Sequence, residues 1–581
     1  MNAYNPALRI PRQAAGRPAA QSCGRLATQR QAALLTARLR LIVLIAGFLV
    51  LACAAILRIA YIGVAKPASE VRSMAEILLP DRGDIVDRNG IPLARAFPAY
   101  ALWFNPAAMD DGGDPLVQGP EAVAARLAGI FPDIDPADMT ARLASGKAGY
   151  LRRRVLPEDA NRVQAIGEIA LELPHETDRY YPQGSMAAHV LGFVAADGKG
   201  RVGMEEALDA RLMNPAMRGQ PAALSIDMRV QGALEDELGK GMRAVNATGA
   251  AGIVLDVDTG EVLALASLPE FDPNHIDAEG QKLMFNRVTN QVYELGSTFK
   301  PLAVAAAIDA GAITDISRRW SAAPFEVSGY TIKDLHAMGA SLNAPETLIH
   351  SSNIVTARIV DDLGPANLKR YMEELGMNAR PHIELPAKGF PIWPSGRWPR
   401  LRAMTVGYGH GIAVTPLHLA SAYAAMVNGG TWRPATLEKV TPGTAPKGRR
   451  VFKASTSARM NQLLRMITVY GTGKKADAPG FRVGGKTGSA EKPGAGGYRK
   501  TTLVSTFAAA FPMDKPRYVI IAMLDEPKGT IASSYQRTAG YTAAPIVGKL
   551  VPRIGPMLDV LPEANRDIDL SDLRPLISEV D

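Results

Sequence analysis

The stretch GIVLDVDTGEVLALAS, residues 252–267, decides the fold of the larger part of this chain. Its two apolar runs meet at Asp258-Thr259-Gly260, and turn residues between such runs predict two strands joined by a tight turn. Helical stretches dominate from about 297 to 430, and strand-like runs return only at 481–485, 502–511 and 517–524, before a helical run at 539–550. This order predicts an α+β domain whose sheet is assembled from both ends of the segment.

Residues 65–224, which precede this segment, mix strand and helix signals over shorter runs. The pair Asn89-Gly90 between apolar residues is a strong hairpin signal. Pro120–Ile130 is typical of a helix, and 188–194 is typical of a strand. A separate mixed α/β domain is therefore expected here.

Two further stretches mark the ends of the sheet domain. Residues 225–245 form an amphipathic pattern that predicts a helix, with Ser225 or Asp227 as its cap. Residues 556–581 contain seven acidic and two basic side chains. This last stretch is expected to be a solvated tail or a loosely packed segment.

One long apolar run, LIVLIAGFLVLACAAILRIAYIGV at residues 41–64, is interrupted only by Arg58. As a helix it would be about 36 Å long, which is enough to cross a hydrocarbon core of about 30 Å. Residues 1–40 contain seven Arg and no Lys, Asp or Glu, so the positive-inside rule places them in the cytoplasm and the rest outside. A cleaved signal peptide or a lipoprotein signal is the alternative, but apolar sequence continues past Cys53 and the preceding segment is long.

Composition excludes several classes of function. The formal net charge is +8, and residues 1–40 carry +7 of it. The remaining 541 residues therefore carry only +1, which disfavours nucleic-acid binding. Both cysteines, Cys23 and Cys53, lie in the tail and the span, which excludes disulfides and thiol catalysis in the outer part. No metal is expected because the eight His include no HExxH or comparable pair, and no cofactor is expected either.

Two familiar motifs are excluded by their context. Residues 480–487, GFRVGGKT, match the P-loop pattern, but the glycines and Pro493 that follow cannot start the helix that would hold phosphate. Asp258-Thr259-Gly260 matches the aspartic-protease triplet, but that chemistry needs a second carboxylate and the chain has no second copy. Both motifs are interpreted as structural.

Ser297-Thr-Phe-Lys300 is the first of three short motifs that carry chemistry. Pro301 is tolerated only in the first turn of a helix, so Ser297 is expected at the N-terminus of the helix that follows. Positions i and i+3 share a helix face, which puts the Lys300 amine beside the Ser297 hydroxyl. A serine becomes a good nucleophile when a base takes its proton, and a buried lysine can be that base.

The other two motifs are Ser351-Ser-Asn353 and Lys486-Thr-Gly488. Taken alone, Ser351 and Asn353 are most simply caps of the helix that follows. Lys486 alone would be a solvated lysine where a short apolar strand ends. Gly488 would let a peptide substrate approach the backbone closely.

In this order, SxxK, SxN and KTG are the signature of the penicillin-recognising serine acyltransferases, and the chain resembles a class B penicillin-binding protein. Further matching segments are RGDIVDRNGIPLA at 82–94, RYYPQG at 179–184, AHVLG at 188–192, GYGHG at 407–411 and GKTGSAEK at 485–492. The last of these and DEP at 525–527 resemble the division-specific (FtsI-like) D,D-transpeptidases most. Leu295 stands where the family often has Pro, and Ser489 stands where Thr is commoner.

The resemblance implies a single-pass membrane helix, a mixed α/β pedestal and an α+β transpeptidase domain with an antiparallel sheet flanked by helices. The expected boundaries are a cytoplasmic basic tail at 1–40, a membrane helix at 41–64, a pedestal at 65–224, a transpeptidase domain at 225–555 and an acidic tail at 556–581.

It also implies roles for the motif residues. Ser297 would attack the D-Ala–D-Ala bond of a peptidoglycan stem peptide, with Lys300 as the base and with Ser351 and Lys486 relaying the proton to the leaving amine. The residues that would bind substrate are Asn353, Thr487, Gly488 and Ser489. β-Lactams would acylate Ser297, and the enzyme would be a serine-type transpeptidase or carboxypeptidase.

The implied partners are stem peptides and, in the inner membrane at the division septum, an FtsW-like lipid-II polymerase and other divisome membrane proteins. The alternatives are an elongation-type transpeptidase, a β-lactamase or β-lactam sensor, and a catalytically silent division scaffold. A bifunctional glycosyltransferase is disfavoured because only about 160 residues separate the apolar run from the acyltransferase domain.

Overall fold

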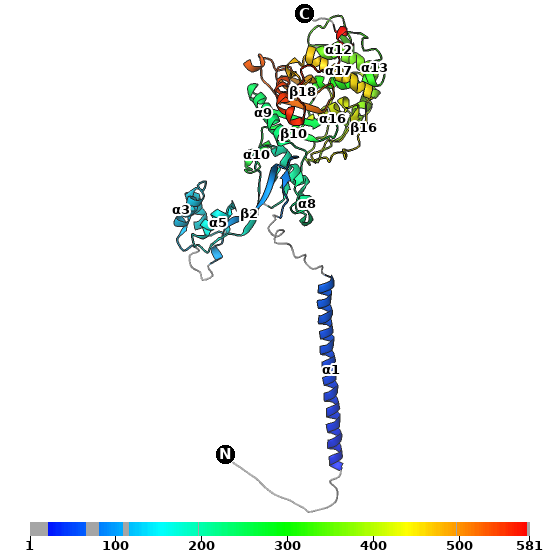
Figure 1. The fold of residues 1–581 in the computed structure, drawn as a ribbon. Coiled ribbons are helices and arrows are strands. Elements are labelled where there is room, and N and C mark those ends of the chain that lie inside the picture. The colour runs from blue at the N-terminus through cyan, green and yellow to red at the C-terminus, as the bar shows by residue number, and fades with distance from the viewer. Residues whose placement is uncertain (1–20, 66–80, 109–115, 196, 495–496, 578–581) are drawn as a thin grey trace, which may run out of the picture. The chain divides into compact units, whose positions relative to one another are not determined.

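A computed structural model of the chain describes residues 21–65, 81–108, 116–195, 197–494 and 497–577. The chain divides into two units, Met1–Leu79 and Pro80–Asp581. The first contains one long helix, α1 (Gln21–Ala65), which extends beyond the predicted run at both ends (Figure 1). Within it, Leu34–Tyr61 is long and apolar enough to cross a membrane, and its side chains are exposed. A helix that is apolar all round and unpacked differs from the core helix of a soluble domain.

The N-terminal part of the second unit, residues 81–224, is called the pedestal below. Its strands are β1 (Ile85–Val86), β2 (Pro92–Phe104), β3 (Gly149–Val155), β4 (Leu171–Glu172), β5 (His175–Tyr180), β6 (Phe193–Val194), β7 (Gly200–Arg201) and β8 (Ala222–Ala223). Its helices and 3-10 turns are η1 (Pro106–Ala108), α3 (Pro120–Ile130), α4 (Pro136–Ala144), α5 (Pro157–Gln164), α6 (Ala188–Leu191), α7 (Gly203–Ala207), α8 (Asp209–Leu212) and η2 (Pro215–Met217). Strands β1 to β5 and β8 form one sheet around the long β2.

Two local predictions for the pedestal had different outcomes. The hairpin is confirmed, because β1 pairs antiparallel with β2 across Asn89-Gly90, and Gly90 has a φ of 86°. The predicted strand over 188–194 is wrong for most of its length: residues 188–191 form the helical turn α6. The Leu191 N–H donates to the Ala187 carbonyl, and Gly192, with a φ of 75°, then redirects the chain.

The rest of the second unit is an α+β domain around a five-stranded antiparallel sheet of order β10-β9-β19-β18-β17. These strands are β9 (Gly249–Asp256), β10 (Val262–Leu268), β17 (Gly484–Gly494), β18 (Gly497–Phe511) and β19 (Tyr518–Asp525). The short strands are β11 (Trp320–Ser321), β12 (Phe325–Val327), β13 (Tyr330–Ile332), β14 (Ser341–Leu342), β15 (Thr431–Trp432) and β16 (Arg449–Arg450). The predicted assembly of the sheet from both ends of the segment is confirmed.

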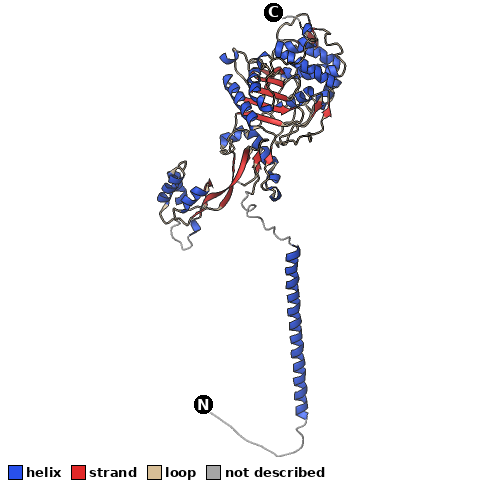
Figure 2. Cartoon of the chain, in the orientation of Figure 1, coloured by secondary structure: helices blue, strands red, loops and turns tan. Residues whose placement is uncertain are grey.

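Helices cover both faces of this sheet (Figure 2). The helices of this domain are α9 (Met228–Ala244), α10 (Ala278–Leu283), α11 (Lys300–Asp309), α12 (Ala344–His350), α13 (Asn353–Leu363), α14 (Pro365–Glu374), α15 (Arg400–Gly407), α16 (Pro416–Val427), α17 (Ala454–Tyr470) and α18 (Ala544–Ile554). The 3-10 turns are η3 (Gly296–Phe299), η4 (Lys474–Ala476), η5 (Ile531–Ser533), η6 (Pro556–Leu558) and η7 (Arg574–Leu576).

Strand β19 shows how the sheet divides the core. Val519, Ile521 and Met523 belong to the cluster that includes α11, α16 and α17. The alternate residues, such as Ile520 and Leu524, pack with α9 and α18 on the other face. Because side chains alternate along a strand, an apolar run without interruption is what a strand buried on both faces requires.

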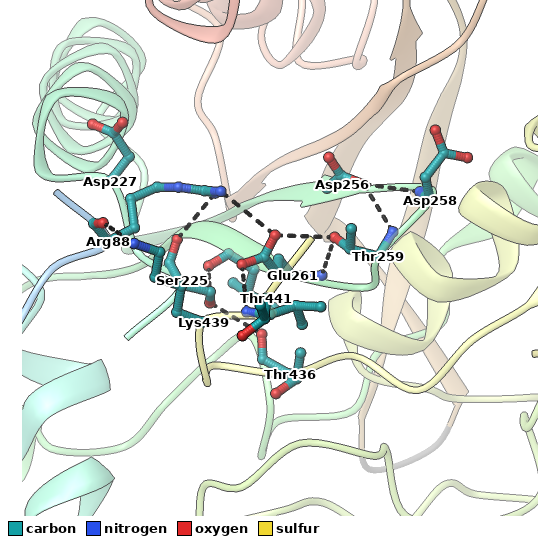
Figure 3. A network of polar contacts seen from close by, with 12 residues as sticks. Arg88, Ser225, Asp227, Asp256, Asp258, Thr259, Glu261, Thr436, Lys439 and Thr441 are labelled. Carbon is teal, nitrogen blue, oxygen red and sulfur yellow. Dashed lines mark hydrogen bonds and ion pairs between the residues drawn. The ribbon is translucent and has the colours of Figure 1, made fainter. Parts of the chain in front are cut away.

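A polar junction joins the pedestal to the sheet domain (Figure 3). Arg88 pairs with the buried Glu261 at 3.5 Å, and the Lys439 amine donates to the Arg88 carbonyl at 2.8 Å. Beside it, the fully buried Asp87 accepts from the backbone N–H groups of Asn89, Ile91 and Met228. One carboxylate therefore closes the β1–β2 turn and holds the first residue of α9.

The acidic C-terminal segment packs more closely than expected. Leu573 is fully buried, and Asp567 accepts hydrogen bonds from Arg465 on α17 at 2.7–3.0 Å. Arg465 also donates to the Val483 carbonyl, just before β17. The segment thus supports the strand that carries the KTG motif.

Replacing Asp87 by alanine should destabilise this junction by about 2–4 kcal/mol, because three backbone N–H groups lose a buried acceptor. The measurement is thermal unfolding of the full chain in detergent, together with hydrogen exchange of the first turn of α9. Asp258→Ala, which removes an exposed carboxylate on the β9–β10 turn, is the control and should change stability by less than about 0.5 kcal/mol. Equal effects of the two variants would contradict this role for Asp87.

Candidate active site

Ser297 lies on η3, a 3-10 turn that leads directly into α11. The Lys300 backbone N–H donates to the Ser297 carbonyl, and in such a turn the side chains at i and i+3 eclipse. Ser297 is half-buried, whereas Lys300 is fully buried. The expected helical N-terminus is therefore corrected to a 3-10 turn, which still places the two side chains on one side.

The Lys300 amine makes its contacts with Ser351. It donates to the Ser351 backbone carbonyl and, at 3.1 Å, to the Ser351 hydroxyl. Burial lowers the pKa of Lys300 to about 7, and the nearby Asp334 opposes this only in part. A lysine in this state is uncharged in a large fraction of molecules near neutral pH, so it can accept a proton.

Lys486 approaches the same hydroxyl from the sheet. It is fully buried, and its amine lies 2.9 Å from the Ser351 Oγ and 3.2 Å from the Thr487 Oγ1. Burial, followed by the neighbouring Lys300, lowers the pKa of Lys486 well below its usual value. The three sequence motifs thus meet at one oxygen atom.

The backbone around Ser351 is arranged to present that oxygen. Ser351 ends α12 with a φ of 64°, a left-handed conformation that costs a non-glycine residue about 1–2 kcal/mol. Ser352, not Ser351 or Asn353, caps α13 by accepting from the Val355 N–H. The interpretation of Ser351 and Asn353 as caps is therefore wrong: Asn353 is the first residue of α13, and its amide donates to the Lys333 carbonyl at 3.4 Å.

Asp334 is a site residue that the sequence analysis missed. Its carboxylate accepts from the Ser352 hydroxyl at 2.6 Å, from the Asn353 backbone N–H and, at 3.2 Å, from the Ile354 N–H. A carboxylate at a helix N-terminus is favoured by the helix dipole. Asp334 follows the β12–β13 hairpin and matches no motif, so no pattern in this one sequence marks it.

Strand β17 brings the KTG residues against η3, the turn that carries the candidate nucleophile Ser297 and is called the nucleophile turn below. A Cβ atom on Gly488 would lie 2.4 Å from the Leu295 carbonyl oxygen and 2.7 Å from the Thr298 Cγ2. The space beside Gly488, expected to admit a peptide, is thus filled by the chain's own turn. Lys486 is the third residue of β17, so the motif stands where a strand begins and not where one ends.

The hydroxyls of Thr487 and Ser489 are each held by a residue distant in sequence. The Thr487 Oγ1 lies 2.8 Å from the Thr472 Oγ1, and the Ser489 Oγ accepts from the Ala539 N–H at 3.0 Å. Positions i and i+2 on a strand share a face, so the two hydroxyls lie side by side. Among the strands that the structure describes, β17 pairs only with β18 and is an edge strand, and an edge can accept an added peptide strand.

Comparisons with known proteins agree with this architecture. The family model described as the penicillin-binding protein transpeptidase domain matches residues 250–551, and that of the penicillin-binding protein dimerisation domain matches residues 77–219. A probable peptidoglycan D,D-transpeptidase FtsI of Caulobacter vibrioides is 38% identical over 489 residues, covering 82% of each chain. The peptidoglycan D,D-transpeptidase FtsI of Escherichia coli K12 is 29% identical over 560 residues, covering 90% of this chain and 92% of its own.

Among solved structures, penicillin-binding protein 3 of Mycobacterium tuberculosis, complexed with aztreonam, aligns with a TM-score of 0.65 at 24% identity, covering 84% of this chain and 99% of its own. A peptidoglycan synthetase of Bifidobacterium adolescentis aligns equally well, at 23% identity and with coverage of 84% and 97%. These two likenesses concern the fold. The matched domains and the close relative together show that the chain belongs to the penicillin-binding protein family and carries both its dimerisation and its transpeptidase domain.

Proposed function

We propose that this protein is a peptidoglycan D,D-transpeptidase that cross-links stem peptides through a serine acyl-enzyme during septal wall synthesis. The observation that carries the proposal is the convergence of the Lys300 and Lys486 amines on the Ser351 hydroxyl, with Lys300 one 3-10 turn after Ser297. The names of the FtsI relatives support the substrate and the septal role.

In the first step the Ser297 Oγ attacks the carbonyl carbon of the D-Ala–D-Ala bond, and its proton passes to the neutral Lys300 amine. The backbone N–H groups of Ser297 and Ser489 stabilise the oxyanion, a contribution of about 3 kcal/mol per donor. The C–N bond then breaks, and the leaving amine receives its proton through Ser351. Since the Ser351 oxygen can accept from both lysines, its own O–H is left to donate to the leaving nitrogen.

In the second step an amine of another stem peptide attacks the ester carbonyl, and the C–O bond to Ser297 breaks. The proton of the amine passes through Lys300 to the Ser297 Oγ, and the new amide is the cross-link. When water replaces the amine, the product is a free carboxylate, which is carboxypeptidase activity.

The remaining site residues bind the donor peptide. Thr487 and Ser489 hold its terminal carboxylate beside the Lys486 amine, whose proton the anion stabilises. The Asn353 amide is placed to bind the peptide backbone. Gly488 acts by bringing β17 against the nucleophile turn.

Helix α1 anchors the chain in the inner membrane, with the basic residues 1–40 in the cytoplasm and the catalytic domain outside. The expected membrane partners are an FtsW-like lipid-II polymerase and other divisome proteins. β-Lactams act as mimics of the donor and acylate Ser297.

Ser297→Ala should abolish both D-Ala release and cross-link formation from a donor and an acceptor stem peptide, measured by liquid chromatography. Ser351→Ala should lower the rates of D-Ala release and cross-link formation by about a thousandfold, because the loss of one residue of a catalytic unit removes most of the unit's effect. The matched control is Ser341→Ala: Ser341 belongs to the second SxN sequence of the chain and should leave activity unchanged. Cross-linking that survives Ser297→Ala would favour the silent scaffold.

The rate of acylation by a fluorescent penicillin should rise with pH, with a midpoint near pH 7. Lys300, with a pKa of about 7, is protonated below this pH and cannot accept the Ser297 proton. The rate should therefore fall about tenfold per pH unit well below the midpoint and level off above it.

Asp334→Asn removes the one carboxylate that raises the Lys300 pKa, so it should move the midpoint to lower pH. Asp315→Asn, in an exposed turn, is the control. A profile without a midpoint between about pH 5 and 9 would contradict the role of Lys300, as would an upward shift in Asp334→Asn.

A further inference from the structure

A cavity of about 560 Å³ lies in the helical part of the transpeptidase domain. Its apolar lining comes mostly from one loop and the start of α15, namely Ile392, Trp393, Pro394, Pro399 and Leu401. The polar side chains of the lining are Ser328, Arg402 and Thr405, and Gly411 completes it. A mostly apolar cavity of this size with a few polar groups is typical of a ligand site.

The loop that lines the cavity is rigidly held. Trp398 is buried, its indole N–H donates to the Pro394 carbonyl at 3.0 Å, and its ring centroid lies 5.0 Å from that of Trp393. The backbone of Ile392 is paired with that of Ala413. Trp393 itself is half-buried, so part of its ring remains available in a cavity that exists before any ligand arrives.

One exposed cation belongs to the cavity lining. Arg402 is exposed and has no carboxylate partner among the residues that the structure describes. Arg400, two positions before it, is already paired with Asp361 at 2.6 Å. An unpaired guanidinium group beside an apolar wall favours a ligand that carries a carboxylate on an otherwise apolar or peptide-like body.

The wall of this cavity touches the nucleophile turn. The Gly411 N–H donates to the Glu294 carboxylate at 3.0 Å, three residues before Ser297. A Cβ atom on Gly409 would lie 2.0 Å from the Gly296 carbonyl oxygen, so the backbones are in contact there. The cavity lining comes from residues 328–411, whereas the edge available to the donor peptide is that of β17.

We propose that this cavity binds the acceptor stem peptide, with the Arg402 guanidinium on one of its carboxylates and its apolar part against Trp393. This assignment rests on the proposed function, since only a transpeptidase needs a second peptide beside the acyl-enzyme. The bound acceptor presents its free amine to the Ser297 ester, whose C–O bond breaks as the amide forms. The proton of the amine returns through Lys300 to the Ser297 Oγ.

The test measures aminolysis of the acyl-enzyme by the full-length chain in detergent. The donor is a soluble D-Ala-ended peptide, and the acceptors are two amine-bearing stem peptides, one with free carboxylates and one with these amidated. In the unaltered chain, the concentration that gives half-maximal aminolysis should be about tenfold higher for the amidated acceptor than for the carboxylate acceptor. Arg402→Glu should raise this concentration at least about tenfold for the carboxylate acceptor and leave it almost unchanged for the amidated acceptor.

Trp393→Ala should weaken the binding of both acceptors. Trp393→Phe should bind them nearly as well as the unaltered chain, because the apolar contact is with the aromatic ring. Lys447→Glu, an equal charge change at another exposed site, is the control and should change neither acceptor curve. The proposal would be overturned if Arg402→Glu affected both acceptors alike. It would also be overturned if acylation of Ser297 by penicillin fell together with aminolysis, because the cavity would then serve the fold.

A second measurement separates this proposal from the proposed function. Binding of the carboxylate acceptor to Ser297→Ala is followed by tryptophan fluorescence, which needs no catalysis. Binding that Arg402→Glu weakens supports the cavity even if the chain forms no cross-links. If the acceptor does not bind to Ser297→Ala while penicillin still acylates Ser297 in the unaltered chain, the acceptor site is overturned and the proposed function is left intact.

Discussion

Two lysine amines out of contact with water, sharing one serine hydroxyl, are the constraint on which the rest of the structure depends. A buried ammonium is costly, and a second one beside it more so. The arrangement is sustained because Ser351 accepts from both amines. It fixes the position of three elements at once: α11 carries Lys300, the α12–α13 corner carries Ser351, and β17 carries Lys486. Burying the two amines destabilises the fold at this point, but it provides an amine that can accept a proton near neutral pH.

The layers of the transpeptidase domain could be predicted from the sequence because they depend on local patterns. The turn at 258–260 lies between two apolar runs, and the strand over 517–524 alternates between two apolar clusters, so each indicates its own structure. The prediction of a strand over residues 188–194 is wrong for most of its length because their apolar character suits a strand or a buried helical turn equally. The closing helix begins at Ala544 and not at 539, because Pro545 needs a place in its first turn and the Ala539 N–H is used by Ser489.

The motif residues of the candidate site could be found because each has a fixed spacing, but their surroundings could not. The left-handed conformation of Ser351 is imposed by the helices on either side of it, and a serine gives no sign of it. Asp334 lies in a loop and acts on Ser352 across 18 positions. The close contact at Gly488 is with Leu295, nearly 200 positions away. The Ser351 conformation and the contacts of Asp334 and Gly488 depend on which distant segments pack together, and local sequence patterns do not show this. The cavity beside Trp393 depends on such packing as well.

The proposed acyl-enzyme forms on one hydroxyl, that of Ser297, and peptide mapping of a penicillin adduct tests this most directly. The full-length chain is treated with benzylpenicillin, quenched, digested and analysed by mass spectrometry. We expect a single adduct of one penicillin per chain on the peptide that contains Ser297, whose side chain is partly exposed to solvent whereas that of Lys300 is fully buried. An adduct on Ser351 or Ser489, or no adduct on a folded chain, would contradict it.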